Sequence, residues 1–515
     1  MGAGEQNYTD LNKIIDDVGD QFGKKVFVHS AEDGRTITYG QFKEQCNRLG
    51  RFLGSRGLKA NDRIVLISHN CIEWLIIFFG VMKYGATIAP LYEGYSQDSI
   101  ARLVDRMKPK FIFWHEELSE RLPTEGSGEW IPFGHWDTPE VKGEDLFQLT
   151  GAFSGQQLTE RALHGFDDIA IINTTSGTME EPRCVLRNFE SFLYLMRTSI
   201  KRWGVTKNDV ILEYRSFTWL SASSVTLSSA LFTGAKLVIA RKFSSSHFFT
   251  WLQRYGITIA TGVPAVLNML LEKQVSVKKD DFPALRFITS SSAPLYLSKQ
   301  EEFENLYGIP IVQFMGMTEA GLIACSGPEM RKIGSPGRAA DYTEVGIVDY
   351  GGNVLGPGEE GEIVCRGKQV GQYYLLENGG LEVYAPGGRM HTGDIGYIDE
   401  EGFIFVTGRK KNVIIRGGIN VSPLQVDQTL LEHPSIAEAA TFGIPDKIYG
   451  EEVVSLVKLK AGTSPGEEEL LAHCRARVNK EMVPKTILVV EEIPKSDRGK
   501  VAKQQLLDLY YSRTI

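Results

Sequence analysis

The sequence predicts an α/β protein with a large N-terminal domain of βαβ-type sheets, a small β-barrel-like subdomain and a small α+β C-terminal domain. Apolar β-branched runs alternate with amphipathic helical segments through most of the chain. Short alternating strands with glycine-rich turns then occupy residues 341–408. A basic pair, Lys410 and Lys411, precedes a last α+β segment that ends at residue 515.

The composition is that of a folded, globular protein. The chain has 515 residues, of which 42% are hydrophobic and 23% charged, and one core rarely organises that length. The net charge of −8 argues against non-specific binding to nucleic acid or an anionic membrane. The most apolar run, residues 74–82, is shorter than the about 20 residues of a membrane span. The polar N-terminus lacks the apolar core of a signal peptide, so we expect a cytoplasmic protein without a membrane span.

In the first domain, predicted strands alternate with predicted helices, which is typical of mostly parallel sheets with helices on their faces. β-branched or continuous apolar runs indicate the strands, and apolar residues at helical spacing indicate the helices. The predicted strands are residues 26–29, 63–67, 110–114, 169–173, 237–240, 257–260, 287–289 and 309–312. The predicted helices are residues 39–53, 72–83, 189–202, 248–255 and 265–272.

The pattern changes near Gly346, where the strands become shorter. Glycine pairs at residues 351–352 and 387–388 mark tight turns, which favours a β-rich subdomain over residues 341–408. We place the main domain boundary at Lys411, which divides the chain into residues 1–410 and 411–515.

The first candidate site is the loop after the predicted strand 169–173. Thr174, Ser176, Gly177 and Thr178 offer hydroxyls and open backbone to phosphate oxygens, and Arg183 adds a positive charge. The spacing differs from that of a Walker A loop, and an ordinary loop is the alternative.

A second candidate follows the predicted strand 309–312, where a hydroxyl stands beside a carboxylate. Thr318 and Glu319 together can hold a magnesium ion that is also bound to phosphate. The alternative is a helix N-terminus that Thr318 caps.

A third candidate combines a glycine turn with an arginine. Asp394, directly after Gly393, can bind two ribose hydroxyls, and Arg409 can reach a phosphate or the same ribose. The alternative is a structural hairpin.

The fourth candidate is a basic segment, residues 494–500, close to the C-terminus. Lys500 can enter a distant site as a flexible point charge. A solvated basic turn is the alternative.

Taken in order, these segments resemble the adenylate-forming superfamily, which includes acyl-CoA synthetases, aryl-CoA ligases, firefly luciferase and the adenylation domains of peptide synthetases. The resemblance extends from about Asp10 to Leu507. Five family signatures have counterparts here in the same order. The S-G-T-T-G-x-P-K loop corresponds to residues 176–183, the G-x-T-E segment to 316–319 and the T-G-D turn to 392–394. The G-R-x-K hinge corresponds to residues 408–411 and the terminal P-x-x-x-x-G-K to residues 494–500.

The resemblance implies an ATP- and Mg²⁺-dependent ligase. Such an enzyme adenylates a carboxylic acid, releases pyrophosphate and passes the acyl group to the thiol of coenzyme A. The resemblance further implies that the C-terminal domain is mobile and rotates about Lys411 between the two steps. Lys500 would bridge the acid and the α-phosphate, Thr318 would contact the α-phosphate, and Glu319 would hold the magnesium ion.

The remaining site residues are also carried over from the resemblance. It implies phosphate contacts from the loop, an adenine border, ribose ligands and a tunnel for the pantetheine arm. The phosphate contacts would come from Thr174, Ser176, Gly177, Thr178 and Arg183, and the adenine border from Ser292, Ala293 and Pro294 with Met315 and Gly316. The ribose ligands would be Asp394 and Arg409. The tunnel for the pantetheine arm would be lined by Gly417 and Gly418.

The acid itself is less defined. Thr218 stands where amino-acid-activating domains carry an aspartate, so nothing obvious binds an α-ammonium group. Trp219 shortens the pocket and favours a short-chain or aromatic acid, unless it packs in the core. An acyl carrier protein is an alternative acceptor, because it presents the same pantetheine thiol. We expect the acyl pocket to be lined by Phe217, Trp219, Ser223, Val263, Ser290, Ser291, Met317 and Ile323.

The phosphate loop departs from the family pattern. Met179 and Glu180 replace Thr-Gly, and Arg183 replaces lysine. A carboxylate about 8 Å from a phosphate charge costs about 2 kcal/mol at an effective dielectric constant near 20. A catalytically weak relative that only binds its ligand is therefore an alternative, although retention of the other motif residues argues against it.

Overall fold

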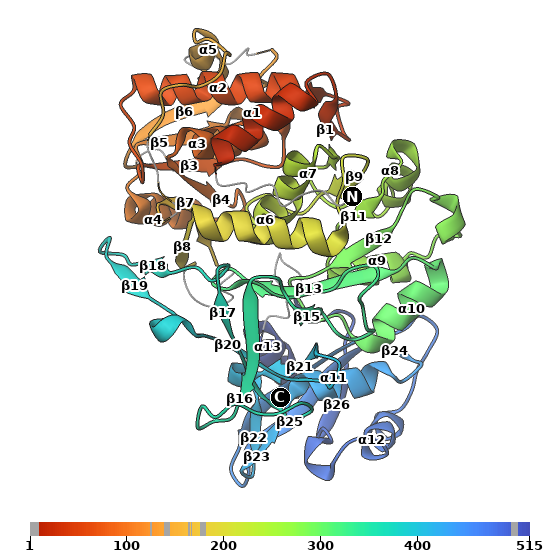
Figure 1. The fold of residues 1–515 in the computed structure, drawn as a ribbon. Helices are drawn as coiled ribbons and strands as arrows, with labels where there is room; N and C mark the ends of the chain where they lie inside the picture. Colours follow the sequence, from red (N-terminus) through yellow and green to blue (C-terminus); the bar gives the residue numbers. More distant parts are fainter. Residues whose placement is uncertain are drawn as a thin grey trace.

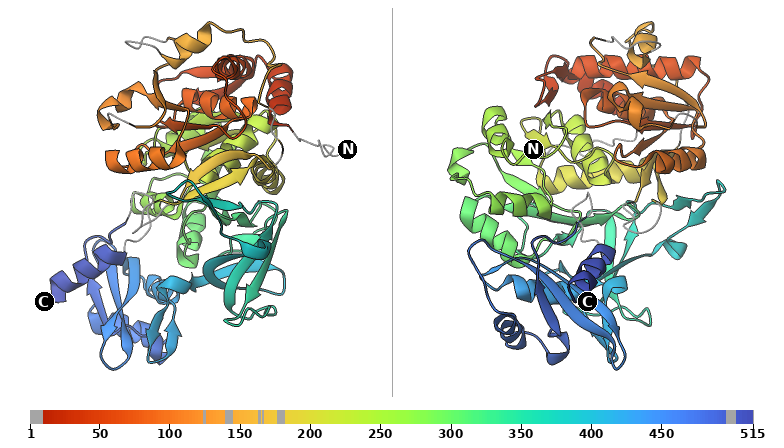
Figure 2. Two further views of the ribbon diagram at one scale, coloured as in Figure 1. Left: turned by 90° about the vertical axis from the view of Figure 1, so that its left-hand side faces the viewer. Right: turned by 180° about the vertical axis from the view of Figure 1, so that it is seen from behind.

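The structure is a computed structural model that describes residues 10–123, 126–138, 145–162, 165, 167–175, 182–495 and 503–514. Figure 1 shows a large N-terminal part, coloured red to cyan, and a smaller C-terminal part in blue. Two further views show the C-terminal part against one end of the N-terminal part (Figure 2). The predicted α/β class and the order of a large and a small domain are confirmed.

An eight-stranded sheet belongs to the first half of the chain. Its order is β19-β18-β8-β7-β4-β3-β5-β6. The central strands run parallel, whereas β8, β18 and β19 are antiparallel to their neighbours. The strands are β3 (Arg63–Ile67), β4 (Thr87–Leu91), β5 (Phe111–His115), β6 (Glu129–Phe133), β7 (Ile169–Thr174), β8 (Cys184–Asn188), β18 (Tyr373–Leu375) and β19 (Leu381–Val383).

A thirteen-stranded sheet contains both the strands between residues 210 and 317 and most strands of the β-rich subdomain that follows. Its order is β16-β17-β20-β21-β15-β14-β13-β12-β11-β9-β10-β1-β2. The strands are β1 (Val26–Ser30), β2 (Thr36–Thr38), β9 (Val210–Glu213), β10 (Lys236–Ile239), β11 (Ile259–Ala260), β12 (Phe287–Ser290), β13 (Ile311–Met317), β14 (Gly321–Cys325), β15 (Gly337–Ala339), β16 (Thr343–Val348), β17 (Gly361–Gly367), β20 (Met390–Ile398) and β21 (Phe403–Arg409).

The β-rich segment is thus continuous with the main sheet. The first half of β13 pairs in parallel with β12, and its second half pairs antiparallel with β14. Because one strand serves both partners, the short strands after residue 320 extend the existing sheet. The strands of this region also begin earlier than residue 341, at β14 and β15.

Helices fill the space between the two large sheets. One core cluster contains residues of β3 and β4, of β9 and β10, and of α1, α2, α3 and α6. The α3 helix is buried on all sides, as expected for a helix that is apolar all round. The helices of this part are α1 (Leu11–Gln21), α2 (Tyr39–Ser55), α3 (Ile72–Tyr84), α4 (Gln97–Met107), α5 (Leu146–Gly151), α6 (Phe189–Trp203), the π-helix η2 (Ser221–Leu227), α7 (Ser228–Thr233), α8 (Phe248–Tyr255), α9 (Pro264–Glu272) and α10 (Leu297–Tyr307), with 3₁₀ turns η1 (Glu116–Arg121), η3 (Lys279–Asp281), η4 (Pro386–Gly388) and η5 (Lys410–Asn412).

The C-terminal part has its own five-stranded sheet and its own core. The order is β23-β22-β25-β24, with β26 pairing with β25. No helix among the described residues is long and apolar enough to cross a membrane. The elements are β22 (Ile414–Arg416), β23 (Ile419–Val421), α11 (Pro423–Leu431), β24 (Ile436–Asp446), β25 (Gly450–Leu459), α12 (Glu467–Arg475), η6 (Lys480–Met482), β26 (Thr486–Val489) and α13 (Lys503–Thr514).

Candidate active site

A cavity of about 960 Å³ lies where the two parts of the molecule meet. The carboxyl ends of β7, β12 and β13, the start of η2 and the β20–β21 pair supply its N-terminal side. The α11 helix, β24 and the segments on either side of residues 496–502 supply the other side. Carboxyl ends of parallel strands are the usual position of ligand sites in α/β sheets.

Thr318 and Glu319 follow β13 and face this cavity. The β13–β14 hairpin is tight, because a Cβ on Gly316 would lie 2.3 Å from the Gly321 carbonyl oxygen. The Glu319 carbonyl accepts hydrogen bonds from the Gly371 N–H at 2.8 Å and from the Tyr384 hydroxyl at 2.9 Å. The Tyr374 hydroxyl donates to Glu319 Oε1 at 2.8 Å. These bonds fix the carboxylate, whose residue is 9% exposed, at the cavity wall.

Tyr374 stays a donor because it cannot ionise easily. Burial, followed by the adjacent Glu319 carboxylate, raises the pKa of Tyr374. Its hydroxyl therefore remains protonated near neutral pH and keeps a hydrogen to donate to Glu319 Oε1.

Arg187 anchors the same turn from behind. This side chain is completely buried on β8, and burial lowers its pKa. Its guanidinium donates to the Thr318 carbonyl at 2.7 Å, and also to the Gln369 carbonyl and the Ser191 hydroxyl. The charge of Arg187 thus fixes the backbone that carries Thr318 and Glu319.

Asp394 and Arg409 are direct cross-strand partners on β20 and β21. Arg409 Nε donates to Asp394 Oδ1 at 2.8 Å. Gly393 adopts a φ of 71°, a conformation that glycine reaches without a steric cost. The predicted glycine turn is thus an irregularity inside β20, where its register against β17 shifts, and both Asp394 and Arg409 line the cavity.

The segment after β12 lines the cavity with Ser291, Ser292, Ala293 and Pro294. Ser292 has a φ of 73°, which is uncommon for a residue with a Cβ. Such strained backbone clusters at functional sites, where it redirects the chain around a ligand.

The C-terminal part reaches the cavity through charged residues near its tail. Lys495 and Lys503, which flank residues 496–502, both line it, and Lys495 forms an ion pair with Glu438 on β24.

The Tyr296 hydroxyl donates to Asp427 Oδ2 on α11 at 3.1 Å and so joins the two parts. Burial raises the pKa of Asp427 to about 7.

Most of the predicted nucleotide-site residues therefore gather at one cavity. The lining includes Thr174, Arg183, Ser292, Ala293, Pro294, Met315, Gly316, Thr318, Glu319, Asp394, Arg409 and Lys411. Ser176, Gly177, Thr178 and Lys500 lie outside the described residues, as do Met179 and Glu180. Gly417 and Gly418 form the β22–β23 turn away from the cavity, where the Gly417 N–H donates to the Tyr449 carbonyl at 2.8 Å.

The structure divides the predicted acyl-pocket residues into two groups. Trp219, Ser291 and Met317 line the cavity. Phe217 is buried against Trp74, with ring centroids 5.3 Å apart. The others also lie away from the lining: Ser223 is buried within η2, Val263 precedes α9, Ser290 lies inside β12, and Ile323 belongs to the core of the β-rich region. Alternating strand residues point to opposite faces, so neighbours of a site residue often face the core.

Sequence reasoning missed several residues of this region. Arg187, Arg215, Ser221, Tyr374 and Asp427 belong to no motif. The one available signal was an arginine inside or directly after an apolar strand, as at Arg187 and Arg215, since a charge at such a position requires a partner.

Glu319 is the cavity carboxylate best suited to a metal ion. Magnesium prefers oxygen ligands and is usually shared between a carboxylate and phosphate, which fits a fixed carboxylate beside Thr318. A different group, His69, Cys71 and His115, has potential ligand atoms within 4.8 Å of one another. It lies at the ends of β3 and β5 and does not line the cavity.

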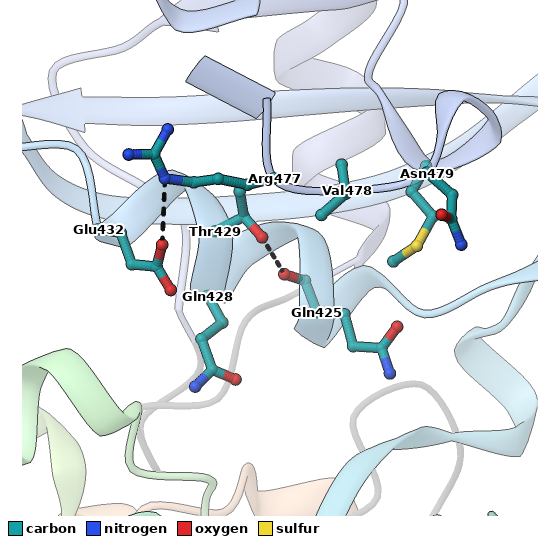
Figure 3. Close-up of a pocket in the computed structure, with 8 residues that line it drawn as sticks. Gln425, Gln428, Thr429, Glu432, Arg477, Val478 and Asn479 are labelled. Carbon is teal, nitrogen blue, oxygen red and sulfur yellow. Dashed lines mark hydrogen bonds and ion pairs between the residues drawn. The ribbon is translucent and has the colours of Figure 1, made fainter. Parts of the chain in front are cut away.

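A smaller hollow of about 340 Å³ lies within the C-terminal part (Figure 3). Its wall includes Gln425 and Gln428 of α11 and Glu432, which follows the helix, opposite Arg477, Val478 and Asn479. Glu432 and Arg477 form an ion pair at 3.5 Å. None of the predicted site residues lines this hollow.

Comparison with protein families gives two matches along the chain. The family model described as AMP-binding enzyme matches residues 15–375. The model described as AMP-binding enzyme C-terminal domain matches residues 425–500.

Full-length relatives are also similar. Oxalate–CoA ligase of Arabidopsis thaliana is 28% identical, with 96% of this chain and 97% of the relative covered. Sulfoacetate–CoA ligase of Cupriavidus necator is 27% identical, with 95% of each chain covered. ATP-bound MatB from Rhodopseudomonas palustris has the same fold, with a TM-score of 0.88, 23% identity, and coverage of 98% of this chain and 100% of that one.

Proposed function

Because the chain belongs to the AMP-binding enzyme family, we propose that its large cavity is where ATP and a small carboxylic acid meet. The activity is that of an ATP-dependent, AMP-forming acid–CoA ligase. The carboxylate attacks the α-phosphorus of ATP, pyrophosphate leaves, and the acyl-adenylate then gives its acyl group to the thiol of coenzyme A. The observation that carries the site assignment is the convergence of Glu319, the Asp394–Arg409 pair and the strained Ser292 segment on one cavity.

Each group suits one part of the nucleotide. Asp394, held by Arg409 at 2.8 Å, presents a carboxylate that can accept both ribose hydroxyls. The Ser292 segment and Met315, which line the cavity, would border the adenine. Arg183 adds a cation on the phosphate side, and its guanidinium lies 5.3 Å from the Tyr374 ring centroid. Glu319 and Thr318 would hold Mg²⁺, which supplies counter-charge to the phosphate oxygens when bound.

The chemistry first has to bring two anions together. The repulsion between these anions raises the activation barrier of the first step. A positive charge that is already in place lowers that barrier, because it needs no reorganisation during the reaction. We assign this role to Lys500, since Lys495 and Lys503 on either side of its segment line the cavity. The Lys495–Glu438 ion pair holds the last described residue before Lys500 beside β24.

The present arrangement is suited to adenylation rather than to thiol transfer. Lys495 and Lys503 line the cavity, whereas Gly417 and Gly418 lie away from it. We propose that the C-terminal domain, residues 411–515, rotates about Lys411 so that the glycine turn replaces the tail. Such a hinge needs only a few residues to change their dihedral angles.

The size of the acid is limited by Trp219, which lines the cavity. The two relatives above are named for oxalate and sulfoacetate, which are small acids. We propose that this enzyme also takes a small acid, short-chain or aromatic, with coenzyme A as the acceptor.

The test is to incubate the protein with ATP, Mg²⁺, coenzyme A and a mixed acid library, and to measure pyrophosphate and acyl-CoA masses. We expect pyrophosphate release and one dominant acyl-CoA. Lys500→Ala should slow adenylation about 100-fold or more, whereas Lys13→Ala, at an exposed position of α1, should not. Absence of pyrophosphate with every acid would refute the proposed activity.

A further inference from the structure

Three polar side chains at the cavity have no part in the nucleotide site described above. Arg215 follows β9, Ser221 begins the π-helix η2, and Ser291 follows β12. Ser221 and Ser291 line the cavity. Arg215 lies directly behind them, 3% exposed, with Nη1 3.4 Å from Ser221 Oγ and 3.3 Å from Ser291 Oγ.

Arg215 is held in one orientation by a buried carboxylate. Its Nε and Nη2 donate to Glu213 Oε1 and Oε2 at 3.0 and 2.6 Å. The Thr261 hydroxyl and the Arg215 backbone N–H also donate to Glu213 Oε1, both at 2.9 Å. Glu213 is fully buried and well satisfied, so it faces away from the cavity while the Nη1 edge of Arg215 faces the two serines.

This arrangement orients the serine hydroxyls. Because Arg215 is donor-only, each serine oxygen serves as the acceptor from Nη1. Ser291 Oγ also lies 3.5 Å from Ser292 Oγ, in a pair in which either hydroxyl can donate. When Ser292 donates in that pair, both the Ser221 and the Ser291 hydroxyl hydrogens can be given to a group inside the cavity. Two hydroxyls that accept from the same guanidinium nitrogen can each donate to an oxygen of a carboxylate or sulfonate.

The position of the group matches the end of the acid that does not react. Ser291 is the immediate neighbour of Ser292, in the segment assigned to the adenine border, so the acyl side of the cavity begins at this point. Trp219 and Leu220, which precede Ser221, line the same wall and limit its depth. A short acid therefore spans the distance from the reacting end to the serines.

We propose that Ser221 and Ser291, backed by Arg215, form a subsite for a second anionic group, so that the substrate is a short diacid or sulfo-acid. This inference rests on the proposed acid-activating function. It makes charge, as well as size, the property by which the enzyme selects its acid.

The test uses pairs of acids with matched shape and different charge. Sulfoacetate is compared with 3,3-dimethylbutanoate, and malonate with 3-methylbutanoate, in a pyrophosphate-release assay with ATP and Mg²⁺. We expect kcat/KM to be on the order of 100-fold higher for the anionic member of at least one pair. Equal or higher values for both apolar members would overturn the subsite while leaving the proposed ligase activity intact. Absence of turnover with all four acids and with the mixed library would instead refute the activity itself.

Variants locate the effect. In Ser221→Ala/Ser291→Ala the anionic-to-apolar ratio of kcat/KM should fall at least about 10-fold, because the oriented donors are lost while the Arg215–Glu213 pair remains. Ser512→Ala, at an exposed position of α13, is the matched control and should keep the ratio of the parent. A ratio is independent of the fraction of folded protein, so an unchanged ratio in the double variant would contradict the assignment.

Discussion

Arg187→Met tests whether a buried charge positions the catalytic turn. The parent guanidinium donates to the Thr318 and Gln369 carbonyls and to the Ser191 hydroxyl from a completely buried position. Methionine fills a similar volume but removes every donor. The variant therefore releases the backbone of Thr318 without touching any group that faces the cavity.

The size of the effect follows from what each acceptor loses. The Gln369 carbonyl keeps a hydrogen bond from Ser191 Oγ at 2.8 Å, whereas the described residues offer the Thr318 carbonyl no second donor. Three hydrogen bonds from a charged donor are lost, at about 1.5–3 kcal/mol each, and relief of the desolvated cation offsets a large part of this. We expect a net loss of about 3 kcal/mol in the free energy of unfolding, and about half of that for Arg187→Lys.

Urea denaturation measures the stability, and pyrophosphate release below the unfolding transition measures kcat. Because Thr318 and Glu319 lose their anchor, kcat should fall about 10-fold or more in Arg187→Met even when the protein is fully folded. Arg187→Lys should recover part of both losses. A destabilisation below about 1 kcal/mol together with an unchanged kcat would refute the reasoning.

Three further predictions concern charge. Glu319→Gln keeps an acceptor for the Tyr374 hydroxyl but loses the charge, so kcat for pyrophosphate release should fall about 100-fold with little change in melting temperature; an unchanged rate at limiting Mg²⁺ would exclude a metal role. Glu180→Gly, outside the described residues, should lower the KM for ATP by up to about 30-fold, because about 2 kcal/mol of repulsion disappears; an equal or higher KM would count against repulsion. Burial raises the pKa of Asp427 to about 7. The stability that its protonated form contributes is fully present below the unfolded pKa of about 4 and falls by about 1.4 kcal/mol per pH unit between there and pH 7. Asp427→Asn should remove that slope in thermal unfolding between pH 5 and 7, and parallel curves for parent and variant would contradict the assignment.

Much of the fold follows from local pattern. The apolar run at residues 74–82 predicts a buried helix, and α3 is buried on every side between Cys71, whose Sγ caps its start, and Gly85, which ends it in the left-handed conformation. The strand ends that carry Thr174 and Thr318 are also predictable, because polar residues directly follow apolar runs.

Other elements were hidden by their composition. The serine-rich stretch of η2 and α7 has no clear apolar face, yet most of its side chains are buried. Its hydroxyls donate to carbonyls within the helices, as Ser228 does to Ser223 and Ser229 does to Val225. A serine satisfied in this way can be buried, and no periodicity in the sequence reveals it.

The sequence by itself determined the local elements, the family signatures and the order in which they occur. Only the tertiary structure decided that Arg215 would meet Ser291, 76 residues away, and that Tyr296 would meet Asp427 across the domain boundary, 131 residues away. Neighbouring residues are enough to specify periodicity, caps and turns. Contacts between distant segments depend on the order of strands in a sheet and on how two domains pack, which are properties of the whole chain.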